Sequence, residues 1–153
     1  MTYEIDKFDR KILKALSQNA RMSITELATH IGLSKTPCHN RLKRLEQEGY
    51  ILGYIALLDP MKMDMEHIAF VEVKLSDTRA KALSEFNAAI RKIHEIEQCH
   101  MIAGGFDYLL KIRTQDIRSY HQLLGEKISS LPHLAHTSTF VAMEAVKDIA
   151  ILA

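Results

Sequence analysis

The spacing of apolar residues changes near Tyr50, and this change restricts the chain to a helical part followed by an α/β part. Before Tyr50, apolar residues such as Phe8, Ile12 and Leu16 recur every three or four positions, which is the spacing of a helix buried on one face. After it, stretches rich in Ile, Val, Leu and Tyr alternate with helical stretches. The 153 residues therefore predict two domains, residues 1–50 and 68–153, joined by an extended connecting segment, residues 51–67.

The first 50 residues predict three helices. Asp6 is placed to cap the first helix, and the S-x-x-E pattern of Ser23 and Glu26 predicts a capping box for the second. Gly32 stands where a left-handed helix end is expected, and Ser34 is placed to cap the third helix directly after it. Two helices joined by so short a glycine turn form a helix-turn-helix.

The third predicted helix has an apolar and a polar face. Cys38, Leu42 and Leu45 recur at i, i+4 and i+7 and must face inward. The opposite side carries amides, hydroxyls and cations, and residues 30–45 hold four Lys or Arg and no acid, although the whole chain has a net charge of only +1. Such a face fits the major groove of DNA, while a plain three-helix bundle with a polar surface is the alternative. The predicted DNA-binding residues are Ser34, Lys35, Thr36, Pro37, His39, Asn40, Arg41, Lys43 and Arg44.

The second domain predicts a ferredoxin-like fold. Strands are expected over residues 68–75, 96–103, 108–113 and 137–146, and helices over 79–94 and from Asp116 to Pro132. The order β-α-β-β-α-β gives one antiparallel sheet, so the fold class is α+β. With helices on one face only, the other face is a natural interface between subunits. A dimer would place two third helices one DNA turn apart, about 34 Å. The apolar tail, residues 147–153, is expected to form a fifth strand or a packing arm.

The turn AGGFDY, residues 103–108, is the second candidate site. Its simplest interpretation is a hairpin turn in which the glycines supply positive φ. The same turn could bind a ligand, because glycines let a ligand approach backbone amides and Asp107 could accept from an ammonium group. Amides for a carboxylate and an aspartate for an ammonium together describe a free amino acid.

Other classes of site are not indicated. Cys38 and Cys99 lie too far apart to suggest a disulfide framework or metal spacing, and none of the eight histidines falls in an H-x-x-x-H pattern. Nucleotide-binding and catalytic motifs are missing, so no enzyme, metal or cofactor is expected. No uncharged run approaches the ~20 residues of a membrane span, which favours a cytoplasmic protein. A small enzyme or standalone amino-acid-binding domain is a rival that leaves residues 1–50 unexplained.

The whole chain resembles the Lrp/AsnC, or feast/famine, family of transcription regulators, most of all its leucine-responsive branch. The N-terminal signature is DKFDRKILKALSQNARMS followed by ITELATHIGLSKTPCHNRLKRLEQEGYILGYIALLDP. The C-terminal signature is CHMIAGGFDYLLKIR followed by SYHQLLGEKISSLPHLAHTSTFVAMEAVK. The resemblance implies a winged helix-turn-helix domain, a hinge strand near residues 50–60 and a ferredoxin-like effector domain.

The resemblance also implies partners. It implies double-stranded DNA, dimers formed through the sheets, octamers or other multiples of dimers, and a free amino acid, of leucine type or similar, bound beside the hairpin turn. The implied effector-binding residues are Gly104, Gly105, Phe106, Asp107, Tyr108, Thr137, Ser138 and Thr139. A regulator of this kind is associated with the nucleoid, and a sequence-tolerant architectural protein is the alternative within the same resemblance.

Overall fold

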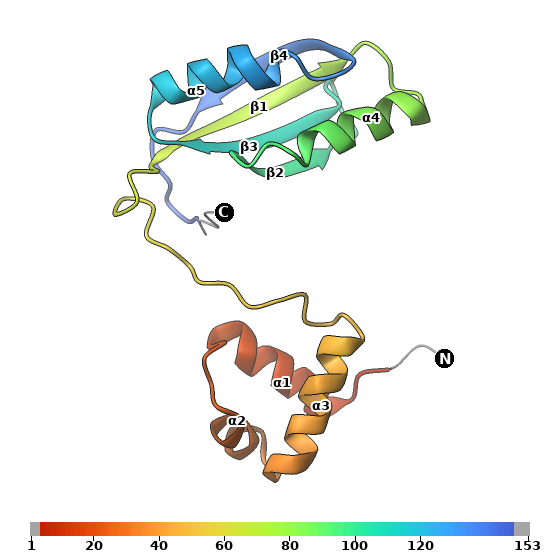
Figure 1. Ribbon diagram of the computed structural model, residues 1–153, viewed down its shortest axis with the longest axis vertical. Helices are drawn as coiled ribbons and strands as arrows, with labels where there is room; N and C mark the ends of the chain where they lie inside the picture. The colour runs from red at the N-terminus through yellow and green to blue at the C-terminus, as the bar shows by residue number, and fades with distance from the viewer. Residues whose placement is uncertain (1–3, 149–153) are drawn as a thin grey trace. The chain divides into compact units, whose positions relative to one another are not determined.

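The computed structural model describes residues 4–148 and divides the chain into two compact units, Met1–Ala56 and Leu57–Ala153. Figure 1 shows that the first unit is helical and that the second is a sheet with helices. Among the described residues, no helix is both long and apolar enough to cross a membrane.

The N-terminal unit contains three helices, α1 (Lys7–Gln18), α2 (Ile24–Ile31) and α3 (Lys35–Gln47). Three of the four predicted helix-end features are confirmed. The carboxylate of Asp6 accepts hydrogen bonds from the first turn of α1, Ser23 and Glu26 form the capping box of α2, and Gly32 ends α2 with a φ of 78°.

The predicted cap of α3 is wrong, because the side chain of Ser34 makes no capping hydrogen bond. Ser34 does occupy the position before the helix, with extended backbone angles. An N-cap oxygen accepts from the amide of the second or third helical residue. The third residue here is Pro37, which has no N–H, so one of these two donors is missing.

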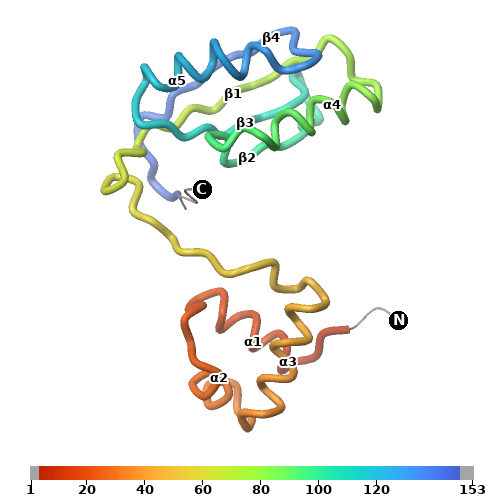
Figure 2. Tube along the Cα trace, viewed as in Figure 1, coloured from red at the N-terminus to blue at the C-terminus, as the bar shows by residue number. Residues whose placement is uncertain are grey.

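One apolar cluster holds the three helices together. Ile12 of α1, Leu27 and Ile31 of α2, and Cys38 and Leu45 of α3 are all almost fully buried in it. The inward face predicted for α3 is therefore correct, and its opposite face is left to solvent. Figure 2 traces the chain through these helices.

The C-terminal unit is an antiparallel sheet with two helices, as predicted. Its elements are β1 (His67–Leu75), α4 (Ala80–Ile90), β2 (Ile96–Met101), β3 (Tyr108–Thr114), α5 (Ile117–Leu123), a π-helical turn η1 (Leu124–Ile128) and β4 (Leu134–Val141). The strand order is β2-β3-β1-β4, and both helices lie on the same face of the sheet (Figure 1). This confirms the α+β fold class and the ferredoxin-like order.

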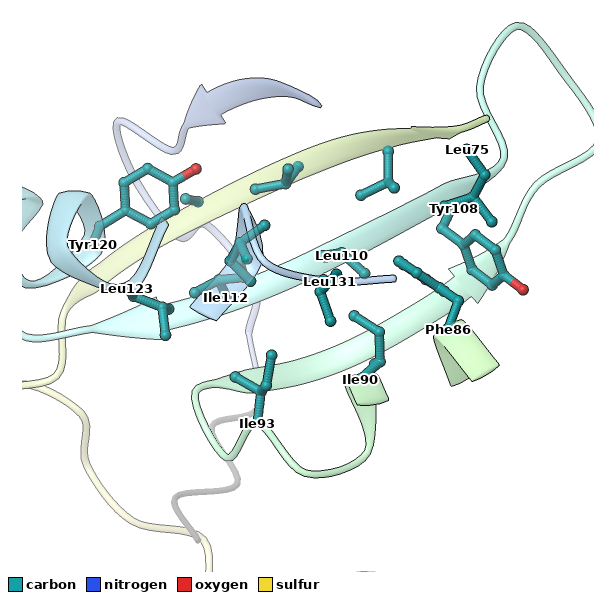
Figure 3. Close-up of a cluster of buried hydrophobic side chains, with 14 residues drawn as sticks. Leu75, Phe86, Ile90, Ile93, Tyr108, Leu110, Ile112, Tyr120, Leu123 and Leu131 are labelled. Atoms are coloured by element: carbon teal, nitrogen blue, oxygen red, sulfur yellow. The ribbon is translucent and has the colours of Figure 1, made fainter. Parts of the chain in front are cut away.

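Side chains from the sheet and both helices form a second core. Phe86 and Ile90 of α4 and Leu123 of α5 meet Leu110 and Ile112 of β3, as Figure 3 shows. Several predicted bounds differ from those observed: α4 ends at Ile90 rather than at residue 94, and β4 runs over Leu134–Val141 rather than over 137–146. Residues 91–95 form turns that bring Ile93 into the core.

The extended segment over residues 50–58 forms no strand within the chain. A strand needs a neighbour that accepts and donates ladder hydrogen bonds, and the described residues supply none there. Its large apolar side chains are consequently exposed, with Leu52 98%, Ile55 60% and Leu57 65% accessible. Within the described residues, this segment pairs with no strand, although the Tyr54 hydroxyl donates to Glu46 at 2.8 Å.

Four charged residues gather on the sheet face opposite the helices. Lys111 and Arg113 of β3 both form ion pairs with Glu97 of β2 and with Asp148 near the C-terminus. Arg113 also donates to the backbone oxygen of Met65 over 3.0 Å. These contacts hold Asp148 against the sheet, as a packing arm would, while residues 149–153 of the predicted tail lie outside the described residues.

Candidate nucleic-acid interface and effector site

The outward face of α3 contains most of the predicted DNA-binding residues. Ser34, Lys35, Thr36, Pro37, His39, Asn40, Lys43 and Arg44 are all exposed. In the part of the chain that the structure describes, neither Lys35 nor Lys43 has an acidic partner. Hydroxyl, amide and imidazole groups beside two such cations can bind base edges and phosphates in a groove.

Arg41 departs from the rest of the set, because it points back to α1. Its Nη1 donates to the carboxylates of Asp6 at 2.6 Å and of Asp9 at 2.9 Å, and its side chain is 25% exposed. Hydrogen bonds to Asp9 and Asp6 raise the pKa of the Arg41 guanidinium. The pKa of Asp6 is lowered by its hydrogen bond from the Asp9 amide and by Arg41. Arg41 therefore braces α3 against the start of α1.

Arg41 supplies a partner for the buried carboxylate of Asp9. The Asp9 side chain is fully buried, and it accepts from the Asp6 amide at 3.0 Å as well as from Arg41. Arg44 Nη2 lies 3.9 Å from Oδ2 of Asp9, the oxygen that accepts from the Asp6 amide. A buried carboxylate requires such partners. The acid-free stretch seen in the sequence thus meets two acids at the start of α1, Asp6 before the helix and Asp9 within it, and sequence spacing gave no sign of this pairing.

The hairpin turn between β2 and β3 is fixed to the end of β1 by Asp107. Its carboxylate accepts from the Leu75 amide at 2.8 Å and from Lys74 Nζ at 3.3 Å, and its own amide donates to the Val73 oxygen at 2.8 Å. The ladder between β1 and β3 stops at Val73, which leaves the Leu75 amide for the carboxylate. The amide hydrogen bond and Lys74 lower the pKa of Asp107.

The two glycines of the turn do not adopt positive φ, so that expectation was wrong. A side chain at Gly105 would meet no atom within 4 Å, and one at Gly104 would only touch Ile102 at 3.5 Å. Neither backbone angle nor crowding within one chain requires glycine there. The turn consequently leaves open space above its backbone.

A cavity of about 330 Å³ adjoins this turn. It is lined by Gly105 and Phe106 from the turn, Ser138 from β4, and Glu72, Lys74 and His136 from the facing strands. The last three were missed in the sequence. They could have been found from strand alternation, since β1 and β4 pair Glu72 with Ser138 and Lys74 with His136. A carboxylate and an ammonium therefore share one cavity.

The other five predicted effector residues do not line this cavity. Tyr108 is 2% exposed, and the centroid of its ring lies 4.6 Å from that of Phe86. Figure 3 shows these two side chains near each other in the core. Thr137 and Thr139 pair with core-facing residues of β1, and the hydroxyl of Thr139 hydrogen-bonds Tyr120 at 2.5 Å. Gly104 and Asp107 stand beside the cavity without lining it. The structure thus brings together three of the eight predicted effector residues.

No group of three or more His, Cys, Asp or Glu within residues 4–148 could hold a metal ion. A larger cavity, about 690 Å³, lies between residues 57–61 and the C-terminal segment 142–148. Arg113 at its wall is already paired with Glu97 and Asp148.

Comparison with known proteins decides the family. Residues 5–51 match the family described as "Winged helix-turn-helix DNA-binding", and residues 68–151 match the "Lrp/AsnC ligand binding domain". The chain belongs to the Lrp/AsnC family of transcription regulators. It is therefore a DNA-binding regulator with a ligand-binding domain rather than an enzyme.

Members of the family with different names are similar to this chain. A proline dehydrogenase transcriptional activator of Rhizobium radiobacter is 64% identical over 98% of this chain and 96% of its own. The leucine-responsive regulatory protein of Escherichia coli K12 is 44% identical over 95% of this chain and 88% of its own. A regulator from Neisseria meningitidis, solved as an L-Met complex, has a TM-score of 0.87 at 30% identity, covering 95% and 94%.

Proposed function

We propose that this regulator binds its DNA sites through α3 and responds to proline, acting on the transcription of a proline dehydrogenase gene. The support is the 64% identity to an activator of that name, against 44% to a leucine-responsive regulator. The leucine-type effector expected from the sequence is the second candidate, supported by the latter similarity. Both candidates are free amino acids, and the same cavity serves both.

The cavity beside the turn is the observation that carries the effector proposal. Glu72 is placed to accept from the ammonium group of an amino acid, and Lys74 and His136 to contact its carboxylate. Phe106 supplies an apolar wall for a ring or aliphatic side chain. A volume of about 330 Å³ is within the range of small-ligand sites. Asp107 holds the turn in place rather than binding the ligand directly.

The residues of α3 fall into three groups by their chemistry: those that contact bases, those that contact phosphates and one that supports the fold. Thr36, His39 and Asn40 are placed to contact base edges, and Lys35 and Lys43 to contact phosphates. Arg41 is assigned to the fold of the domain, because Asp6 and Asp9 occupy its guanidinium.

Assembly into dimers and higher multiples completes the proposal. Phe70 and Phe140 form a cross-strand pair on the sheet face without helices and are 38% and 55% exposed. This pair and the exposed apolar segment over residues 50–58 are surfaces that a second copy would bury. An amino acid that binds one assembly more tightly shifts the equilibrium, with a coupling of about 1–3 kcal/mol.

Calorimetric titration of the full chain with each of the twenty amino acids tests the effector. Proline is expected to bind, and Glu72→Gln to abolish binding because its neutral amide no longer attracts the ammonium group. Glu4→Gln, an exposed carboxylate in the other unit, is the matched control. Binding of leucine but not proline would transfer the assignment to the second candidate. Unaltered proline affinity in Glu72→Gln would reject the cavity.

Footprinting against competitor DNA separates a specific regulator from an architectural protein. The proposal expects protection of defined sites at competitor levels where a sequence-tolerant protein spreads along the duplex. Spreading without defined boundaries would favour the architectural alternative.

A further inference from the structure

The exposed charged residues of α1 are all cations. The four cations of this helix are exposed and lie opposite its buried positions Ile12 and Leu16. The single acid of α1, Asp9, is buried and directed to Arg41. Within the described residues none of the four has an ion-pair partner. We name this surface the α1 basic face; it consists of Lys7, Arg10, Lys11 and Lys14.

The placement of these cations is unfavourable for the helix itself. Lys7 is the first helical residue, and Arg10 and Lys11 follow within the next turn, at the end of the helix dipole that repels cations. Lys7 with Lys11, and Arg10 with Lys14, are like-charge pairs four positions apart, which also destabilise a helix. Residues that oppose the local structure without internal compensation are typical of functional surfaces. An external anion would supply the compensation.

The α1 basic face lies next to α3. The Nζ of Lys11 and the Cζ of Arg41 each lie 5.6 Å from the centroid of the Phe8 ring, within the range of cation–π contacts. α1 and α3 pack against each other (Figure 1). On its other side, Lys11 lines with Lys14 and His30 a groove of about 230 Å³ between α1 and α2. The α1 basic face therefore adjoins α3 through Phe8, where Arg41 itself is paired with Asp6 and Asp9.

We propose that the α1 basic face binds the phosphate backbone of the duplex that α3 holds, beside the bases that α3 reads and without regard to their sequence. This inference rests on the proposed role of α3. DNA is favoured over an acidic protein because α3 already fixes a polyanion next to this surface. Flexible lysines that act as point charges are also suited to phosphates.

The test compares the parent protein with Lys7→Ala/Lys11→Ala/Lys14→Ala. Dissociation constants are measured between about 50 and 200 mM salt for a duplex selected from a random pool by the parent and for a shuffled duplex. All three side chains are exposed, and alanine favours helices, so the domain is expected to fold. Arg91→Ala/Lys92→Ala/Arg118→Ala, which removes three exposed cations from the other unit, is the matched control.

The salt slope is the deciding quantity. Each lost phosphate contact lowers it by about 0.9, so the triple variant is expected to lose nearly 3 on both duplexes. The preference for the selected duplex stays that of the parent, and the control keeps the parental slope. A salt slope equal to that of the parent in the α1 variant would overturn the inference. If that variant kept the parental slope but lost binding to an acidic peptide, the α1 basic face would be a protein-binding surface and the inference would likewise be wrong.

Failure of this inference is distinguishable from failure of the role of α3. Asn40→Ala is expected to reduce the preference between the two duplexes while leaving the salt slope nearly intact. An unaltered preference in Asn40→Ala would reject base reading by α3. An unaltered slope in the α1 variant alone would reject only the α1 basic face.

Discussion

Replacing Arg41 by alanine is expected to lower the stability of the DNA-binding unit, because Arg41 contacts Asp6 and Asp9 of the same unit. The guanidinium is the nearest cation to the fully buried carboxylate of Asp9, at 2.9 Å. Breaking a buried ion pair by removing one partner costs about 3–5 kcal/mol. Asp9 keeps its hydrogen bond from the Asp6 amide and Arg44 at 3.9 Å, so we expect a loss of about 2–3 kcal/mol.

Native-state hydrogen exchange of the full chain measures this loss where it occurs. The slowest amides of α1 and α3 are expected to exchange about 30 to 150 times faster in Arg41→Ala, since each 1.4 kcal/mol is a factor of ten. Amides of the C-terminal sheet serve as the internal reference. Adding Asp9→Asn should restore part of the protection, because a buried neutral amide costs less than an unpaired carboxylate.

Lys43→Ala is the matched comparison for DNA binding. Its exposed side chain has no acidic partner in the described chain. Its loss is therefore expected to alter the stability, and with it the exchange rates of α1 and α3, only by as much as an ordinary surface substitution does. If Arg41→Ala left the exchange of α1 and α3 unaltered, the brace between these helices would carry no stability and the reasoning would be refuted.

Three further predictions concern Lys43, Asp107 and Asp148. Lys43→Ala is expected to weaken binding to selected and shuffled duplexes alike and to lower the salt slope by about 1, and an effect confined to one duplex would contradict a phosphate contact. Asp107→Ala is expected to speed exchange of the Leu75 amide and to lower the affinity for the amino acid, measured by calorimetry, because the turn loses its anchor; unaltered exchange would refute this. Burial raises the pKa of Asp148, but its ion pairs with Lys111 and Arg113 outweigh burial and lower the pKa. A carboxylate whose pKa is lowered in the folded state stabilises that state at pH values above its ordinary pKa. This stabilisation is lost as the pH falls through the lowered pKa. Limited proteolysis measures how firmly the C-terminal segment is attached, and we expect the segment to be held at neutral pH and to loosen below about pH 4. In Asp148→Asn it should be loose already at neutral pH. Equal cleavage of both proteins at neutral pH would contradict the ion pairs.

The sequence predicted the features that depend on local spacing. Caps at Asp6 and Ser23, the stop at Gly32 and the alternation of strands and helices all arise from neighbouring residues, and each is observed. The missing cap at Ser34 is also local, because Pro37 removes a donor, yet the prediction treated the two residues separately.

Features that depend on pairing across the chain were not predictable in the same way. Arg41 meets Asp9 across 32 positions, and Asp107 meets Leu75 across 32 positions. Glu72 and His136 reach the cavity beside the turn only through the register of β1 with β4. These contacts give Arg41 and Asp107 partners within the chain, and the strand register places Glu72 and His136 beside the turn.

The affinity of the full chain for a selected duplex, measured with and without proline, tests the central claim most directly. We expect proline to alter the dissociation constant by about 5- to 150-fold, the range that corresponds to a coupling of about 1–3 kcal/mol. Glu72→Gln should lose this change. An identical dissociation constant with and without saturating proline would contradict the account.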